Sequence, residues 1–184
     1  MRKKFYQLLK EKRRSNLITI KKARPEHAAG IARICTEANW ATYRELRSAA
    51  YIKRVIEEFY NEPRILKEIE QTSRSWGGWF VALEEGNVVG AAGGGMTDEK
   101  EAEIYVLYLN PARRNEGIGT MLLEAVTEQQ KKLGAIKQWV SVAEGNQKAI
   151  PFYEARSFQC HSRQADYGSS QEERYQSLRF VRFL

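Results

Sequence analysis

The sequence has few of the residues that build disulfide scaffolds and metal centres. Its 184 residues include two cysteines, Cys35 and Cys160, and two histidines, His27 and His161. At most one disulfide can form, and a chain of this length buries about 70% of its unfolded surface, so we expect folding without disulfides or a bound metal. We predict a reducing, cytoplasmic setting, in which both cysteines are small core residues and both histidines are structural.

Long hydrophobic runs are also absent. No apolar run approaches the roughly 18 residues of a membrane span, and the longest, residues 88–96, is rich in Gly and Ala. The apolar stretch at residues 5–9 is interrupted by Gln7 and followed by Lys10, so it is too short for a signal peptide. We therefore expect no membrane partner.

Excess positive charge is missing from most of the chain. The formal net charge is +7, but residues 1–14 hold seven basic side chains and one acidic one, which leaves 23 basic and 22 acidic side chains in the other 170 residues. A nucleic-acid-binding domain usually carries basic residues over its folded body. We predict a basic N-terminal arm (1–14) and a single domain (15–184), with nucleic-acid binding by the arm as a minor alternative.

Hydrophobic periodicity predicts an α/β fold with a mixed central sheet flanked by helices, because helices alternate with strands in the middle and hairpins lie at both ends. The glycines of residues 90–95 sit inside a strand pattern, which indicates close approach of another backbone or a ligand. The predicted strands are 17–20, 79–83, 88–96, 103–109, 136–142, 158–164 and 175–183, and the predicted helices are 25–38, 48–60, 63–69, 118–133 and 146–156.

The segment 111–120 joins the most strand-like run to the most regular helix and has the chemistry of an anion cradle. The first amides of a helix lack intrahelical partners, the helix dipole adds positive character, and Gly117 and Gly119 let a phosphate approach the backbone. Arg113 and Arg114 add charge. A solvated basic turn, with glycines chosen for packing, explains the same residues. The segment has neither the Gly-Lys-Ser/Thr of a P-loop nor the third glycine of a dinucleotide site.

Two sequence blocks, in this order along the chain, resemble the motifs of a known family. The run Arg114-Asn115-Glu116-Gly117-Ile118-Gly119 resembles the Gln/Arg-x-x-Gly-x-Gly/Ala signature of the GCN5-related N-acetyltransferase (GNAT) superfamily, and residues 146–154 resemble its Asn-x-x-Ala-x-x-Phe-Tyr-Glu block. The sequence departs from the family at Ser157, where Gly is usual, and at Pro151 inside the second block. We expect a different helix exit at Ser157, and Pro151 must delay the helix start or remove a hydrogen bond.

The resemblance implies a GNAT fold and an acetyl-CoA site. The pyrophosphate of the cofactor would rest on the amides of the signature loop, and the pantetheine arm would pair with the preceding strand and meet Asn146, whose side chain would also serve as a helix N-cap. The implied cofactor-binding residues are Leu107, Leu109, Arg114, Asn115, Glu116, Gly117, Ile118, Gly119, Thr120, Asn146 and Tyr153.

The resemblance also implies acetyl transfer to a primary amine. Tyr153 would protonate the leaving thiolate, although packing alone also explains a tyrosine there. Glu103 would serve as the base, directly or through a water, although it is equally explained as an ordinary strand carboxylate. No Cys–His or Ser–His spacing suggests a covalent intermediate, so we expect direct transfer within a ternary complex.

The acceptor region of the family corresponds here to residues 40–45 and 167–173. Their aromatic and acidic side chains favour a small cationic amine, with Trp40, Tyr43 and Tyr167 as the predicted contacts. Acetylation of a protein or peptide amine is the first alternative, and a non-catalytic acyl-CoA sensor is the second. A homodimer is a further open possibility.

Overall fold

The computed structural model describes residues 17–170 and 172–184, so the predicted arm lies outside the described residues. Within these ranges, seven strands form one sheet in the order β1-β2-β3-β4-β5-β7-β6. All neighbouring strands are antiparallel except β4 and β5, which are parallel. The strands are β1 (Thr19–Lys22), β2 (Trp79–Glu84), β3 (Asn87–Met96), β4 (Glu101–Leu109), β5 (Lys137–Ala143), β6 (Gln159–Ala165) and β7 (Gln176–Phe183).

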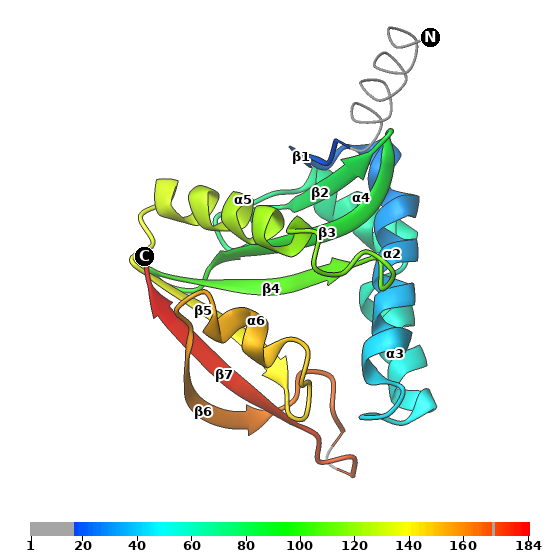
Figure 1. The fold of residues 1–184 in the computed structure, drawn as a ribbon, viewed down its shortest axis with the longest axis vertical. Helices are drawn as coiled ribbons and strands as arrows, with labels where there is room; N and C mark the ends of the chain where they lie inside the picture. Colours follow the sequence, from blue (N-terminus) through cyan, green and yellow to red (C-terminus); the bar gives the residue numbers. More distant parts are fainter. Residues whose placement is uncertain (1–16, 171) are drawn as a thin grey trace, which may run out of the picture.

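Helices pack on both faces of this sheet (Figure 1). The helices α2 and α4 cover one face and α5 and α6 the other, each over its own hydrophobic core. None of the described helices is long and apolar enough to cross a membrane. The predicted mixed sheet with flanking helices is confirmed. The helices are η1 (Pro25–His27, a 3-10 turn), α2 (Ala28–Tyr43), α3 (Ala49–Phe59), α4 (Glu62–Glu70), α5 (Ile118–Lys132) and α6 (Ile150–Glu154).

The amphipathic stripes predicted from the sequence form these two cores. On α2, Ile31 and Ile34 are fully buried, and on α5, Leu122 and Val126 are. Spacings of three and four residues place such pairs on one side of a helix, which turns once every 3.6 residues. Gly134 ends α5 with a φ of +97°, as expected for a glycine after a helix.

The helix predicted at residues 146–156 is shorter than expected. It spans Ile150–Glu154, because Pro151 sits in its first turn, where a helix does not need the missing N–H. Ser157 then adopts a φ of +65°. The expectation of a different exit was therefore wrong: serine takes the left-handed position that glycine usually occupies, at a conformational cost that glycine avoids.

The two cysteines differ in their surroundings. Cys35 is fully buried on α2, and burial raises the pKa of its thiol well above the ordinary value. Cys160 is exposed on β6, all of whose side chains are exposed. The prediction that both are core residues was therefore correct for Cys35 and wrong for Cys160, because β6 is an edge strand with neither face covered.

Candidate active site

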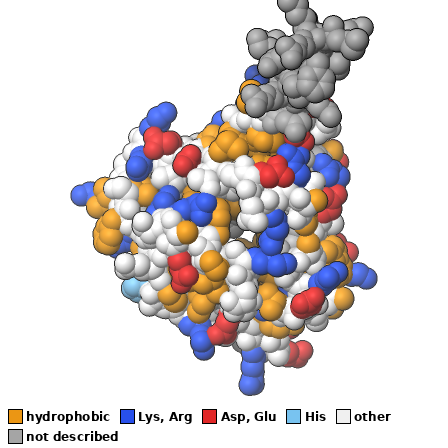
Figure 2. Space-filling view, in the orientation of Figure 1, with side chains coloured by type: hydrophobic (Ala, Val, Ile, Leu, Met, Phe, Trp, Pro, Cys, Tyr) orange, Lys and Arg blue, Asp and Glu red, His pale blue; other side chains and the backbone are white. Residues whose placement is uncertain are grey.

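A cleft opens where β4 and β5 separate. Their ladder runs from the pair Glu101–Lys137 to the pair Ile104–Val140 and then ends, although β4 continues to Leu109 and β5 to Ala143. Beyond this point each strand keeps only its outer neighbour, β3 or β7. The cleft has a volume of about 570 Å³ and is lined by Leu107 and Leu109. Figure 2 shows a hollow near the middle of the molecule's face, with Lys and Arg side chains beside it.

A bulge in β4 marks the place where the strands separate. Gly93 pairs with Val106 and Gly94 with Ile104, so Tyr105 is the extra residue. A bulge bends and twists its strand, which turns β4 away from β5. The glycines of β3 permit this arrangement, because a Cβ on Gly94 would lie 2.2 Å from the Glu103 carbonyl oxygen. The predicted close approach of another backbone to these glycines is confirmed.

The predicted anion cradle closes one end of the cleft. Asn115 has a φ of +62° and Gly117 of +79°, and α5 begins at Ile118. The backbone N–H groups of residues 114–120 donate to no acceptor among the described residues. All seven of these residues line the cleft. Unpaired amides at the start of a 15-residue helix form a site for negatively charged oxygens.

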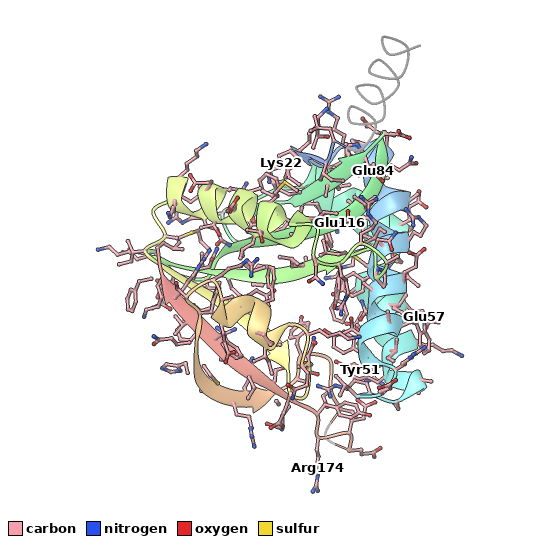
Figure 3. All side chains as sticks on the ribbon, viewed as in Figure 1. Lys22, Tyr51, Glu57, Glu84, Glu116 and Arg174 are labelled. Carbon is pink, nitrogen blue, oxygen red and sulfur yellow. The ribbon has the colours of Figure 1, made fainter. Side chains whose placement is uncertain are left out.

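The two arginines of this loop play different roles. Arg113 donates to Glu116 at 2.7 Å and forms a bidentate contact with Glu84, so the loop is tied to the end of β2 (Figure 3). The guanidinium of Arg113 lowers the pKa values of both carboxyl groups. Arg114 forms no ion pair with a described residue and lines the cleft. Its charge is therefore available to an anion.

Two further cations in the cleft were not predicted from the sequence. Lys148 and Arg156 line it and have no carboxylate partner among the described residues. Arg156 lies 3.8 Å over the Phe152 ring and donates to the hydroxyl of Thr120, while its buried Nε has no partner. Lys148 lies inside the second sequence block and Arg156 follows it, but no spacing rule marked either one.

Asn146 and Tyr153 approach the cleft from the segment around α6. The side-chain oxygen of Asn146 accepts from the Ala149 amide at 3.1 Å and so closes the turn before α6. The predicted N-cap role was wrong, because α6 begins only at Ile150 and Ala149 is its N-cap. Tyr153 is 6% exposed and packs edge to face on Phe152 and Phe158. Its hydroxyl makes no hydrogen bond to a described residue, and burial raises its pKa above the ordinary value of 10. The group is therefore protonated near neutral pH.

A second cavity, of about 550 Å³, lies on the α2–α3 side of β4, and we call it the acceptor pocket. Predicted contacts Tyr43 and Tyr167 line it, as does Glu103. It meets the cleft where β4 and β5 separate. Six residues line both cavities: Tyr43, Ile104, Tyr105, Val106, Tyr108 and Ser141.

Trp40 lines neither cavity, so the structure does not bring it to the site as predicted. The reason is helical geometry. The residues of α2 that line one cavity or both are Ala38, Asn39, Ala41, Thr42 and Tyr43. Each residue advances about 100° around the helix axis, so these five share one side of α2. Trp40 therefore points to the opposite side of the helix.

Glu103 lies in the acceptor pocket but is held by other side chains. Its Oε1 contacts the Arg179 guanidinium and accepts from the Ser141 hydroxyl at 3.3 Å. Its Oε2 accepts no hydrogen bond from a described residue. The carboxylate is thus fixed beside the junction of the two cavities, with one oxygen available.

The aromatic wall contributed by α3 was also missed. Tyr51, Val55 and Phe59 line the acceptor pocket at a spacing of four residues. In the sequence this spacing is indistinguishable from that of a helix packed on a sheet, so the sequence predicts only a helix over residues 48–60.

Comparisons with known proteins agree with this geometry. Residues 38–158 match the model of the acetyltransferase (GNAT) family. The chain is 32% identical over 147 residues to the uncharacterized N-acetyltransferase YuaI of Bacillus subtilis, a match that covers 77% of this chain and 80% of that protein.

Solved structures share the fold. The PaiA N-acetyltransferase of Thermoplasma acidophilum, in complex with coenzyme A, superimposes with a TM-score of 0.74 at 23% identity, over 89% of this chain and 98% of that one. YncA of Salmonella typhimurium, solved with acetyl-CoA, gives 0.69 at 18% identity, over 92% and 95%. The family match and the shared fold confirm the expected acetyl-CoA-dependent N-acetyltransferase, and the chain belongs to the GNAT acetyltransferase family.

Proposed function

We propose that this chain transfers an acetyl group from acetyl-CoA directly to a primary amine that enters through the acceptor pocket. The observation that carries the proposal is the junction of the two cavities, which share six lining residues where β4 leaves β5. One cavity has unpaired amides and cations, and the other has aromatic walls. A direct transfer needs both reactants to meet at one point, and this junction supplies it.

The residues of the cleft fit a CoA thioester. Its phosphates would be held by the amides of residues 114–120 and by Arg114, Lys148 and Arg156. The unpaired edge of β4 at Leu107 and Leu109 suits the amide-bearing pantetheine arm, and Asn146 lies on the opposite wall. When bound, the cofactor supplies the thioester whose acetyl carbon the amine attacks.

Tyr153 is the proposed general acid. Its hydroxyl has no partner among the described residues and stays protonated, so it can donate to the sulfur that leaves. A thiol has a pKa near 8.5 and a phenol near 10. Because full proton transfer is then uphill, a large part of the effect comes from a hydrogen bond to the developing negative charge.

Glu103 is the proposed base. An alkylamine has a pKa of about 10 and is mostly protonated at neutral pH, so it must lose a proton before it can attack. The contacts of Oε1 with Arg179 and Ser141 orient the carboxylate, and Oε2 is left to accept from the amine or from a bridging water. Ser141 lines both cavities, which places this carboxylate next to the junction.

The expected acceptor remains a small amine that is cationic in solution, with a peptide amine as the first alternative. A non-catalytic sensor is the second. The test is release of free thiol from acetyl-CoA across polyamines, aminoglycosides, monoamines, amino acids and short peptides, with cofactor binding measured by calorimetry. We expect binding and amine-dependent release. Binding without release over the whole panel would identify a sensor.

A further inference from the structure

The acceptor pocket has aromatic walls, and its carboxylates are ion-paired with arginines of the protein. Nine of its described lining residues are aromatic, contributed by α2, α3 and its C-cap, the loop between α4 and β2, β2, β4 and the loop after β6. Its three carboxylates are those of Glu68, Glu103 and Asp166. Each of them is paired with a guanidinium.

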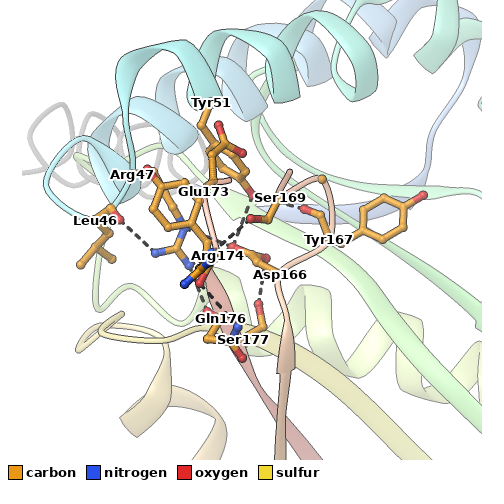
Figure 4. A network of polar contacts seen from close by, with 12 residues as sticks. Leu46, Arg47, Tyr51, Asp166, Tyr167, Ser169, Glu173, Arg174, Gln176 and Ser177 are labelled. Carbon is orange, nitrogen blue, oxygen red and sulfur yellow. Dashed lines mark hydrogen bonds and ion pairs between the residues drawn. The ribbon is translucent and has the colours of Figure 1, made fainter. Parts of the chain in front are cut away.

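The pair Arg47–Asp166 is the most buried of the three. The two side chains are 5% and 14% exposed and lie 2.8 Å apart. Asp166 also accepts from the hydroxyls of Tyr51 at 3.3 Å and Ser177 at 2.8 Å (Figure 4). Its hydrogen-bonding capacity is therefore used within the protein, and little is left for a ligand cation.

The other two carboxylates are neutralised in the same way. Glu68 receives the Arg64 side chain at 2.8 Å and the indole N–H of Trp79 at 2.9 Å. Glu103 is paired with Arg179. In the loop after β6, Glu173 is bound by Arg54 at 2.7 Å and does not line the pocket.

We infer that the acceptor is a primary monoamine with an aromatic or branched aliphatic body and no second charge, an inference that rests on the proposed function for the identity of the site. Polyamines and aminoglycosides carry further ammonium groups, each of which needs an unpaired carboxylate when it leaves water. The described residues of the pocket offer none. Aromatic faces instead pack against an apolar body and attract the single ammonium before it loses its proton.

The first experiment compares phenylethylamine with putrescine, using the full chain saturated with CoA and calorimetry to measure amine binding. We expect phenylethylamine to bind about 10-fold more tightly or better. Equal or tighter binding of putrescine overturns the inference. Thiol release from acetyl-CoA is measured in parallel and tests the proposed function separately: preferential binding without release contradicts the function while supporting the pocket's preference.

A second experiment removes the ion-pair partner of one carboxylate. Arg64→Met removes the guanidinium from Glu68, and we expect the affinity for putrescine to rise roughly 10-fold relative to that for phenylethylamine. The ratio of the two affinities is the readout, because Arg64 itself lines the pocket and lies 4.7 Å over the Phe59 ring. Arg33→Met is the matched control, because Arg33 and Glu37 form the same i,i+4 pair on α2 outside the pocket. If Arg64→Met leaves this ratio at its native value, charge pairing does not determine the preference and the inference fails.

Discussion

The cleft and the acceptor pocket share a wall of β4 and have nearly equal volumes, yet their charges are arranged in opposite ways. The cleft holds Arg114, Lys148 and Arg156 with no carboxylate partner among the described residues. In the pocket, every carboxylate of the described lining is paired with a guanidinium. The cleft is therefore positive, whereas the pocket is close to neutral.

This difference indicates how two ligands are sorted between cavities that open onto each other. A polyanion gains from unpaired cations and amides, and it gains nothing from a neutral aromatic pocket. An amine is repelled from the positive cleft and is drawn to aromatic faces. The alternation of β4 assists this separation, because Leu107 and Leu109 pack with the α5 core whereas Val106 and Tyr108 pack with the α2 core.

The largest effect is expected in the cleft, where Tyr153→Phe removes one hydroxyl. We predict that kcat falls by about 10²–10⁴-fold while the Kd for acetyl-CoA is unchanged, because the packing of the ring on Phe152 and Phe158 is retained. Burial raises the pKa of the native phenol above 10, so the group stays protonated below that pH. The deficit should therefore be constant from about pH 7 to pH 9.

Thiol release and calorimetry on the two proteins check this prediction. A Tyr153→Phe variant that keeps native kcat would leave the tyrosine with a packing role only. A deficit that disappears as the pH rises would assign it to proton removal from the amine instead.

Glu103→Gln should have the next largest effect, about 10²-fold in kcat/KM near neutral pH. The loss should shrink as the pH rises toward the pKa of the amine, because free amine then becomes abundant without a base. Thiol release measured across pH gives the profile. A deficit that does not change with pH removes Glu103 from proton transfer.

Glu101→Gln is the matched control for this variant. Glu101 lies two residues earlier on the same face of β4 and is also ion-paired, with Lys137 at 2.6 Å, but it lines neither cavity. We expect native activity at every pH. A similar pH-dependent loss in both variants would mean that the ion pairs along β4 matter for the fold and not for catalysis.

Removing a cation from the cleft should have a smaller and selective effect. We predict that Arg114→Met weakens acetyl-CoA binding by about 3- to 10-fold, leaves the KM for the amine unchanged, and makes binding less sensitive to salt. Calorimetry at two salt concentrations measures both quantities. An equal loss of amine and cofactor affinity would contradict the separation of charge between the two cavities.

Most of the fold could be predicted from the sequence, because the spacing of apolar residues within each helix or strand indicates which side of that element is buried. The strand predicted at residues 103–109 and the helix predicted at 118–133 correspond to β4 and α5. The errors arise where tertiary context decides. Pro151 shortened α6, and Cys160 is exposed because β6 has neither face covered, which a seven-residue window cannot reveal.

The candidate site was predicted less evenly. A loop that binds a ligand through its backbone amides needs glycines at fixed spacing, and this pattern is visible in the sequence. The signature loop at residues 114–120 was therefore predicted. The acceptor pocket carries no such signal, because its walls come from separate elements. Tyr43 and Trp40 are both aromatic residues of α2, and only the position around the helix axis separates the one that lines the pocket from the one that does not.

The smallest effect is expected from substituting a glycine of the signature loop. Such a variant tests whether the cleft selects its ligand by charge or by the bare backbone that a glycine exposes. Gly119 is unsuited to this test, since a Cβ there would lie 3.2 Å from the Phe152 ring and a bulky residue would disturb the packing. A Cβ on Gly117 would meet no atom of the described residues within 4 Å, so its cost comes from the φ of +79°.

We predict that Gly117→Ala costs about 1 kcal/mol of stability, because an L-residue is disfavoured in this conformation. For a domain of this size, the Tm should fall by about 2–4 °C. Gly117→Asn should recover part of that loss, since asparagine tolerates left-handed backbone and Asn115 already adopts it nearby. Thermal unfolding measures the stability, and calorimetry measures acetyl-CoA binding, which we expect to change by less than about 3-fold in the Asn variant. A Gly117→Asn protein with near-native Tm that no longer binds acetyl-CoA would show that the cofactor needs the bare backbone at this position, and that charge alone does not distinguish the cleft from the pocket.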